Sequence, residues 1–455
     1  MITKEEFEKY CIEHNLRYKI NYDNFQTSIL KDHWNNDNLF IILCSYGYIE
    51  TIKWLYNLEN INIHANDEKA FRNSCHSGHL ELAKWLIKIS KENGEIINIH
   101  AEDEEAFRYS CFHENFAISK WLIEISKENG EIINIHANNE ESFRLSCKYG
   151  KIEVAKWLIE ISKENKEMIN IHANNEDAFI SSCHHIEVAK WLIEISKENG
   201  EMINIHVNNE EAFRSRCINE HIEITKWLMK IAKENGEIIN IHANNEEAFR
   251  YSCCNGEIEK AKWLLNISKK NGNVINIHAK NEGAFRWCCS DGRLEVIKWL
   301  MKISEKNGKI INIHAKDDYA FKYSCMKGNL EVAKLLLKIS KENGEIINIH
   351  AKDEYLFRKS CMNGRLEVAK WLIEIAKENR EIINIHAKNE YAFRFSCAWW
   401  ELEVAKWLCS LCDEYYIEIE NNKIVKYGIK KIYDKFLNEN FGIKKVIKKL
   451  QLKII

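Results

Sequence analysis

Residues 133–150 read Ile-Asn-Ile-His-Ala-Asn-Asn-Glu-Glu-Ser-Phe-Arg-Leu-Ser-Cys-Lys-Tyr-Gly, and close variants of this stretch recur along the 455-residue chain. Copies of its histidine return every 36 residues, with one step of 34, at His64, His100, His136, His172, His206, His242, His278, His314, His350 and His386. Self-similarity at this period predicts a stacked array of small units, which offers a long surface in place of a single pocket. Function must then be sought where the copies differ.

Each copy has the pattern of two helices joined by a short turn. Asn139, followed by two acids, has the residue types of a helix start, because Asn caps free N–H groups and acids suit the positive end of a helix. Gly150 is expected to end this first helix. A second helix is predicted over about 152–165, with Trp157 as its large apolar anchor. The Glu-Ile-Ile-Asn-Ile-His segment that follows such helices predicts an extended loop.

The composition limits the class of protein. A net charge of −3 gives no general attraction to nucleic acid or anionic lipid. The chain lacks an apolar run long enough to cross a membrane, and it does not begin with an apolar signal segment, so we expect an intracellular protein.

Cysteine use supports a reducing environment. Eleven of the 16 cysteines occupy one repeat position: Cys44, Cys75, Cys111, Cys147, Cys183, Cys217, Cys253, Cys289, Cys325, Cys361 and Cys397. Copies should lie about 10 Å apart, whereas a disulfide needs Cα atoms within about 7 Å. We therefore expect reduced thiols that act as small buried apolar groups.

The second-helix pattern carries a family resemblance. The segment Gly78-His-Leu-Glu-Leu-Ala-Lys-Trp-Leu86 resembles the second-helix signature of ankyrin repeats, and residues 150–158 and 364–372 repeat it. The first-helix signature of that family is degenerate, with Ala70-Phe71-Arg72 in place of Pro-Leu-His. The resemblance spans roughly residues 36–412 and extends to ankyrin repeat proteins of giant DNA viruses of amoebae (mimivirus-like). It implies an all-α, ankyrin-type helix-turn-helix solenoid of about 11–12 stacked repeats with end caps.

We divide the chain into an N-terminal cap at 1–35, the repeat array at 36–412, and a divergent Lys-rich pair of C-terminal capping helices within 413–455. Caps are expected because an array must cover its terminal faces. The helical stripe of the C-terminal segment consists of Ile429, Ile432, Tyr433, Phe436 and Leu437. Its lysines leave open an alternative role, in which a basic tail binds nucleic acid or an anionic membrane.

Two patterns suggest a metal, and both have simpler explanations. Histidines about 10 Å apart cannot share an ion that needs its ligands at about 2 Å, so we expect each to join its own loop to the next by hydrogen bonds. The pair His184-His185 is the weaker metal alternative, since no further ligand accompanies it. Cys409 and Cys412 have redox or zinc spacing without a partner pair. Without a nucleophile or phosphate-loop motif, we expect no enzymatic activity, metal, cofactor or small-molecule substrate.

An arginine follows most of the core phenylalanines, at Arg72, Arg108, Arg144, Arg214, Arg250, Arg286, Arg358 and Arg394. One interpretation is that these aligned arginines bind the phosphate groups of a ligand. A structural ladder of contacts with acids such as Glu68, Glu104 and Glu140 is the favoured interpretation, because near-identical residues in every copy suit stacking.

The repeats change character near residue 280. The residue five before the core Phe becomes lysine at Lys280, Lys316, Lys352 and Lys388, and the residue two before it becomes Tyr319, Tyr355 and Tyr391. The residue two after the Phe contributes Tyr251, Trp287, Tyr323 and Phe395, and Trp399 and Trp400 extend this set. If the first helices line a groove, as the resemblance implies, these residues form a basic rim beside an aromatic strip suited to a protein partner. Duplication of one variant repeat is the alternative explanation.

The functional prediction is a non-catalytic, monomeric protein-interaction scaffold that binds a host or viral protein in the host cytoplasm or nucleus. A narrower alternative is an adaptor to the host ubiquitin machinery, although no F-box or BTB-like segment is recognisable.

Overall fold

A computed structural model describes residues 36–58, 60–112, 116–218 and 222–430. Within these ranges the chain forms 22 α-helices and one antiparallel hairpin, so the fold is an all-α helical repeat solenoid of helix pairs. In this part of the chain, none of the helices has the length and apolar character needed to span a membrane. The predicted N-terminal cap at 1–35 lies outside the described residues.

Each pair begins with a short first helix: α3 (Asn36–Tyr46), α5 (Ala65–His76), α7 (Ala101–Ser110), α9 (Ala137–Lys148), α11 (Ala173–Ser182), α13 (Val207–Arg216), α15 (Ala243–Cys254), α17 (Ala279–Ser290), α19 (Ala315–Lys327), α21 (Ala351–Met362) and α23 (Ala387–Ala398). The second helices are α4 (Ile49–Leu58), α6 (Leu80–Glu92), α8 (Ala117–Glu128), α10 (Ile152–Glu164), α12 (Ile186–Glu198), α14 (Ile222–Glu234), α16 (Ile258–Lys270), α18 (Leu294–Lys306), α20 (Leu330–Glu342), α22 (Leu366–Glu378) and α24 (Leu402–Leu411).

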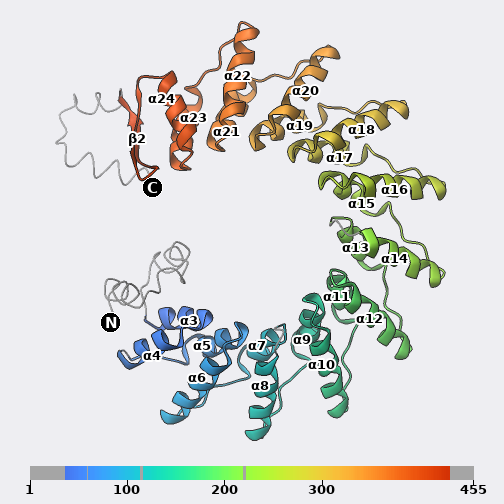
Figure 1. Cartoon of the computed structure of the whole chain (residues 1–455), viewed down its shortest axis with the longest axis vertical. Helices are drawn as coiled ribbons and strands as arrows, with labels where there is room; N and C mark the ends of the chain where they lie inside the picture. Colours follow the sequence, from blue (N-terminus) through green and yellow to red (C-terminus); the bar gives the residue numbers. More distant parts are fainter. Residues whose placement is uncertain (1–35, 59, 113–115, 219–221, 431–455) are drawn as a thin grey trace, which may run out of the picture. The chain divides into compact units, whose positions relative to one another are not determined.

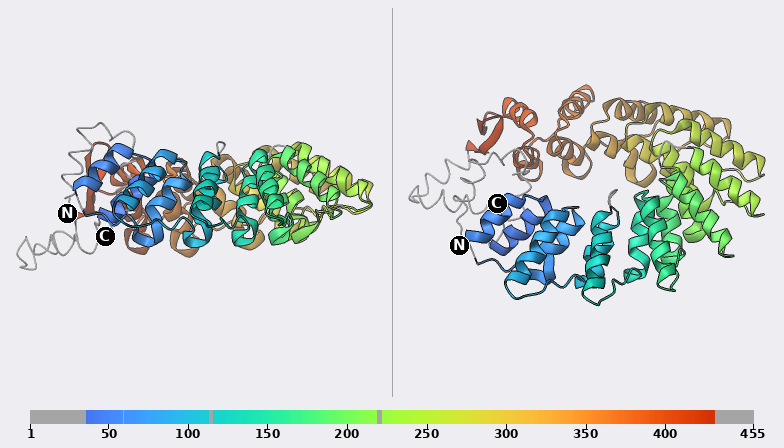
Figure 2. Two further views of the ribbon diagram at one scale, coloured as in Figure 1. Left: turned by 90° about the horizontal axis from the view of Figure 1, so that it is seen from below. Right: turned by 60° about the horizontal axis from the view of Figure 1, so that its bottom comes forward.

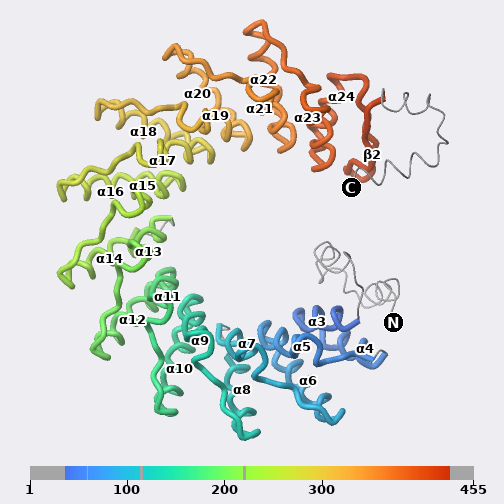
Figure 3. Tube along the Cα trace, turned by 180° about the vertical axis from the view of Figure 1, so that it is seen from behind, coloured from blue at the N-terminus to red at the C-terminus, as the bar shows by residue number. Residues whose placement is uncertain are grey.

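The pairs group into two compact units. Unit 1 holds the described residues through Ala212 together with Lys226–Ile239, and unit 2 holds Phe213–Thr225 and the described residues from Asn240 onward. Within each unit the first helices form one row and the second helices another, as Figures 1 and 2 show. Neighbouring first helices pack directly on one another, whereas the described second helices do not pack on each other as closely, so the first-helix row follows the inner side of the curve within each unit (Figure 3).

The core of each repeat centres on a buried phenylalanine that contacts the next repeat. Phe107 is fully buried, and its ring centroid lies 6.4 Å from that of Trp157 on the second helix of the following repeat. The same pairing occurs at Phe71–Trp121, Phe143–Trp191, Phe179–Trp227, Phe249–Trp299, Phe321–Trp371 and Phe357–Trp407. Burying one such side chain is worth about 1.5–3 kcal/mol, and here the burial needs two repeats.

The aligned cysteines lie beside these phenylalanines as free thiols. All eleven are buried, and burial raises the pKa of the Cys147 and Cys325 thiols well above its ordinary value. This agrees with their predicted role as small apolar core residues.

The predicted start of the first helix is wrong. Asn138, Asn139 and Glu140 do not cap the helix but form a left-handed turn with φ of 55°, 55° and 60°. The same three-residue turn stands at the corresponding place in all ten described repeats from α5 to α23. Its second residue is Asn or Asp each time, the non-glycine residues that tolerate this conformation best.

The other turn agrees with the sequence. Gly150 ends the first helix with φ of 73°, and a Cβ there would lie 2.7 Å from the ring of His185 in the next repeat. The segments after the second helices from α6 to α22 form extended loops without regular structure. In the loop after α6, Ile97 and Ile99 are buried whereas Ile96 is exposed.

The C-terminal cap also differs from the prediction. Residues 415–429 form a hairpin of β1 (Tyr415–Glu420) and β2 (Lys423–Ile429), so the helical prediction is wrong there. Asn421 and Asn422, both at positive φ, make the two-residue turn that such hairpins favour. The rest of the predicted cap, from 431, lies outside the described residues.

This hairpin takes the place of a further repeat. The ring of Tyr415 stacks on Phe393 with centroids 4.1 Å apart, and its hydroxyl donates to Glu390 and lies 3.2 Å from Nδ1 of His386. The last core phenylalanine is thereby covered without a following Trp helix.

We predict that Tyr415→Phe lowers the local opening free energy of α23 by about 1 kcal/mol, because Glu390 loses a hydrogen-bond donor in a partly buried position. Hydrogen exchange of the α23 amides measures this change. Tyr416→Phe is the matched control, and equal protection in both variants would contradict the capping role.

Candidate partner-binding surface

The left-handed turn positions the predicted lysines. Lys280, Lys316, Lys352 and Lys388 each occupy its first residue, with φ of 55–57°, and all four side chains are exposed. The arginine after the core Phe donates hydrogen bonds to the backbone carbonyls of this turn. In α17, Arg286 donates from Nε to the carbonyl of Asn281 at 2.7 Å and from an Nη to that of Lys280 at 3.0 Å. Equivalent bonds are made by Arg72, Arg108, Arg144, Arg250 and Arg358.

The arginines also form the predicted ladder, but with different acids. In the early repeats each guanidinium pairs with the acid two residues before the next core Phe, as in Arg144–Asp177 at 2.5 Å. Further pairs are Arg72–Glu105, Arg108–Glu141 and Arg214–Glu247. The acids expected to pair, Glu68, Glu104 and Glu140, face the repeat histidines instead.

In the late repeats aromatic rings replace these acids. Arg286 lies 4.7 Å above the ring of Tyr319, and Arg358 lies 4.9 Å above that of Tyr391. Arg250 reaches Trp287 at 4.8 Å, past Gly283, where a Cβ would lie 3.0 Å from the arginine side chain. Burial lowers the pKa of Arg250 and Arg286, and such partly desolvated cations gain more from a ring than exposed ones do.

The structure therefore joins the predicted aromatic residues into three separate stacks. Tyr251 stacks on Trp287 at 5.7 Å, Tyr319 on Tyr323 at 4.0 Å, and Tyr391 on Phe395 at 4.1 Å between ring centroids. All six rings are partly exposed. An arginine of the preceding repeat thus lies over one ring of each stack, and each stack stays partly exposed.

The other aromatic residues do not join these stacks. Tyr355 follows a repeat in which Lys322 replaces the arginine, and Lys322 pairs with Asp317 at 2.6 Å. Trp399 and Trp400 are 62% and 70% exposed at the turn before α24, where Trp400 replaces the turn glycine at φ of 58°.

The four lysines are not equivalent. Lys352 lies 3.1 Å from Asp317 and Lys388 lies 2.8 Å from Asp353, each an acid of the preceding repeat. Hydrogen bonds and charge from Lys322 and Lys352 hold the pKa of Asp317 below its usual range, and those from Lys388 do the same for Asp353. Over the described ranges, Lys280 and Lys316 have no carboxylate within ion-pair distance, because the preceding repeats carry Asn245 and Asn281 there.

The repeat histidines join successive repeats, as predicted. Nδ1 of His100 lies 2.8 Å from Glu104 of its own repeat, and Nε2 lies 2.9 Å from Glu131 of the following loop. Burial acts to lower the pKa of His100, but the hydrogen bonds and charges of Glu104 and Glu131 raise it above its ordinary value. His206 and His350 have the same two partners in their repeats and the same raised pKa.

The weaker metal candidates lie apart from this surface. His185 packs against Gly150, and Cys409 and Cys412 are partly buried at the end of α24, where burial raises the pKa of Cys409. In the described part of the chain, no group of three or more His, Cys, Asp or Glu side chains could hold a metal ion.

Comparison with known proteins finds similarity of fold and nothing more specific. No family model and no curated protein matches the chain. Solved structures that resemble it include an ankyrin repeat family protein from Legionella pneumophila, at 18% identity over 76% of this chain and all of that chain, with a TM-score of 0.32. A pentatricopeptide repeat protein from maize aligns at 9% identity over 83% of this chain and 63% of that chain, with a TM-score of 0.26.

The Arg286–Tyr319 contact can be measured by a double-mutant cycle. With Arg286→Gln, Tyr319→Leu and the double variant, we expect a coupling free energy of about 0.5–1 kcal/mol from urea unfolding, because both residues belong to one cation–π pair. Arg286→Gln alone should destabilise more than the same change at the exposed Arg394, since it also removes two bonds to the left-handed turn. A coupling near zero would show that the ring does not hold the arginine.

The raised pKa of His100 predicts a pH dependence of stability. A pKa that is higher in the folded than in the unfolded state contributes stability below the unfolded value, near 6.5, and that contribution is lost as the pH rises through the folded pKa. The stability difference between the native chain and His100→Gln should therefore shrink by up to about 1 kcal/mol between pH 6 and pH 8. Urea midpoints across this range provide the measurement, and a constant difference would be the contrary result.

Proposed function

We propose that the chain is a non-catalytic scaffold that binds a protein partner through the first-helix row of unit 2. The observation that carries this proposal is the combination of Lys280 and Lys316, exposed and without carboxylate partners among the described residues, with the partly exposed ring stacks beside them. Rigid aromatic rings next to cations are typical of the hot spots that contribute most of the binding energy in protein interfaces.

The chemistry favours a partner segment that presents a carboxylate next to an aromatic or large aliphatic side chain. Lys280 and Lys316 supply the charge, and the stacks of Tyr251 with Trp287 and of Tyr319 with Tyr323 supply flat apolar surface. Their rotamers are already restricted by stacking, so binding costs little side-chain entropy. Lys352 and Lys388 contribute less, because an aspartate of the array already neutralises each one.

The wider setting belongs to the same proposal. The second-helix signature supports an ankyrin-type protein. We propose that it is of giant-virus origin and acts as a monomer in the cytoplasm or nucleus of a host cell. A role of the basic tail in membrane or nucleic-acid binding rests on the lysines of residues 421–455, most of which lie beyond the described residues.

A charge-reversal pair tests the proposal. Lys280→Glu with Lys316→Glu should reduce capture of a specific protein from host-cell lysate by about ten-fold, because the introduced acids repel a carboxylate partner. Both side chains are exposed, so the melting temperature should stay unchanged. Quantitative mass spectrometry of the captured proteins provides the readout.

Lys298→Glu with Lys334→Glu is the matched control, since these exposed lysines lie on the second helices α18 and α20. Equal capture by the test pair and the native chain would contradict the proposed surface. Stacked rings beside cations also suit unpaired nucleobases. Binding of a uridine oligonucleotide at physiological salt that the test pair abolishes would replace the protein partner with RNA.

A further inference from the structure

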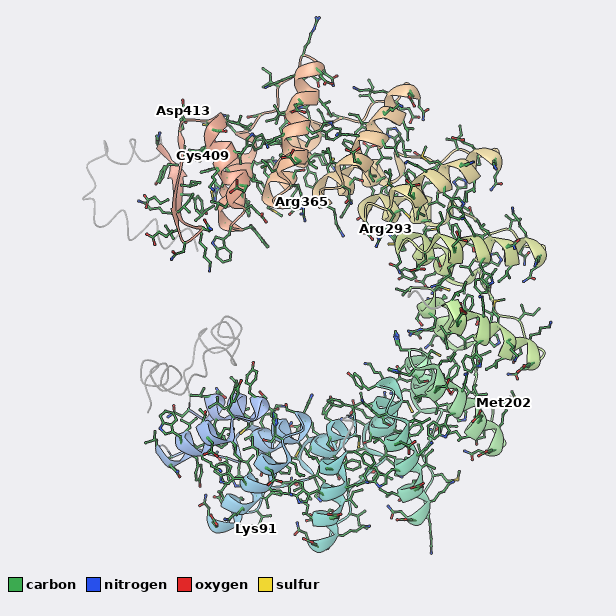
Figure 4. All side chains as sticks on the ribbon, viewed as in Figure 1. Lys91, Met202, Arg293, Arg365, Cys409 and Asp413 are labelled. Carbon is green, nitrogen blue, oxygen red and sulfur yellow. The ribbon has the colours of Figure 1, made fainter. Side chains whose placement is uncertain are left out.

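Each second helix from α6 to α22 is followed by an asparagine, and in most repeats a glycine comes next. The pairs are Asn93-Gly94, Asn129-Gly130, Asn199-Gly200, Asn235-Gly236, Asn271-Gly272, Asn307-Gly308 and Asn343-Gly344. Figure 4 labels Lys91 and Met202, each two residues from one of these pairs, at the ends of second helices that lie away from the first-helix row. This position is separate from the surface proposed above.

The structure leaves room around these pairs. Their glycines have φ of 71–78°, and a Cβ added to any of them would meet no atom within 4 Å apart from its chain neighbours. Six of the asparagine side chains make no hydrogen bond to a residue that the structure describes: Asn129, Asn199, Asn235, Asn271, Asn307 and Asn343. Asn93 differs, because its side-chain amide donates to the hydroxyl of Tyr56 at 2.8 Å.

An accessible asparagine before glycine reacts with its own backbone. The glycine nitrogen attacks the side-chain carbonyl carbon, a C–N bond forms, and the side-chain nitrogen leaves as ammonia with the proton of the glycine N–H. Water then opens the succinimide ring at one of its two carbonyl carbons. The product is aspartate or an isoaspartyl residue, in which the main chain runs through the former side-chain carbon. Glycine favours the attack because it has no Cβ to block it.

Two other Asn-Gly pairs lie in turns between first and second helices, where the structure opposes this reaction. The side-chain amide of Asn255 donates to the carbonyl of Ile218 in the preceding repeat. The side-chain amide of Asn363 likewise donates to the carbonyl of Met326 at 3.1 Å. Each held amide would have to break its bond to the neighbouring repeat before its carbonyl carbon could meet the glycine nitrogen.

We propose that the six asparagines without side-chain partners are sites of spontaneous deamidation, whereas the fold protects the same dipeptide at Asn255 and Asn363. The six sites are Asn129, Asn199, Asn235, Asn271, Asn307 and Asn343. Each event adds one negative charge at the negative end of a second helix, where it is unfavourable.

The isoaspartyl product loosens the joint between a second helix and its loop. In the native joint after α8, the N–H of Gly130 donates to the carbonyl of Lys127 at 3.1 Å, and that of Glu131 donates to the carbonyl of Ser126 at 2.9 Å. An isoaspartyl residue before Gly130 lengthens the main chain by one carbon, so both bonds of this C-cap lose their register. The Glu131 side chain also bonds to His100, so this contact weakens as the molecule ages.

The test follows the purified full-length chain at neutral pH and physiological temperature, with peptide mass spectrometry that measures deamidation at each asparagine. The six sites should gain product at least about five-fold faster than Asn255 and Asn363, because a held amide must first break a hydrogen bond. In the chain unfolded by urea, all eight positions should react at similar rates. Equal rates in the folded chain would overturn the proposal. So would an absence of product at the six sites over a time in which the unfolded chain reacts.

The chain offers a matched control for the role of glycine. Asn165 has φ of −78° and ψ of 0°, close to the −80° and −2° of Asn129, but it is followed by Lys166 at φ of 60°. Gly130→Lys should therefore keep the backbone conformation and abolish product at Asn129, while the rate at Asn199 stays unchanged. Lys166→Gly should create a new site at Asn165. Unaltered product in both variants would contradict the proposed chemistry.

Discussion

Glu104 lies between two repeats, only 6% exposed, and its carboxylate accepts hydrogen bonds from both. Nδ1 of His100 lies 2.8 Å away in the same repeat, and the backbone N–H of Asn134 in the next loop donates at 3.0 Å. Bonds from the following loop recur at Glu68, Glu140, Glu176, Glu246, Glu282 and Glu354. A buried charge is tolerated only with such partners, so neither repeat is complete without its neighbour. The buried glutamate thus enforces the same stacking geometry as the Phe–Trp contacts.

The left-handed turn follows from this constraint. In α7 the turn begins directly after Ala101, which follows His100, and its third residue is the buried Glu104. Arg108, which follows the core Phe of the same repeat, donates two hydrogen bonds to the turn. Three successive non-glycine residues in this conformation are costly, and the guanidinium helps to offset that cost. The same arginine then reaches the following repeat, where an acid or a ring receives it. Asp177 in an early repeat and Tyr319 in a late repeat hold equivalent positions, and each contacts the arginine of the repeat before it. The contact between repeats is therefore kept, while the surface changes from acidic to aromatic.

The contacts between repeats decide which side chains remain exposed on the surface. On the first-helix row, the rings contact arginines of the array. Asn245 and Asn281 stand where later repeats have an aspartate, so Lys280 and Lys316 have no carboxylate partner among the described residues. In the loop after α6, the buried Ile97 and Ile99 anchor the backbone, whereas Ile96 is exposed. Hydrogen bonds such as that between His100 and Glu131 join successive loops.

The sequence by itself determined the helix pairs, the repeat boundaries, the buried Phe and Cys positions, the Gly150 turn and the linking role of the histidines. These follow from periodicity, which reports local preferences copied many times. The Asn or Asp at the second turn position was a signal for the left-handed turn, and Asn421-Asn422 between alternating apolar residues was a signal for the hairpin, but both patterns also suit a helix cap or a loop. Only the tertiary structure decided which acid pairs with each arginine, which rings stack, and which lysines lack a carboxylate partner within the described ranges. The arginine contacts, the lysine–aspartate pairs and the stack of Tyr251 on Trp287 join residues 33 to 37 positions apart, so they depend on the stacking of one repeat on the next. The stacks of Tyr319 on Tyr323 and of Tyr391 on Phe395 lie within one helix, but the arginine over each comes from the preceding repeat.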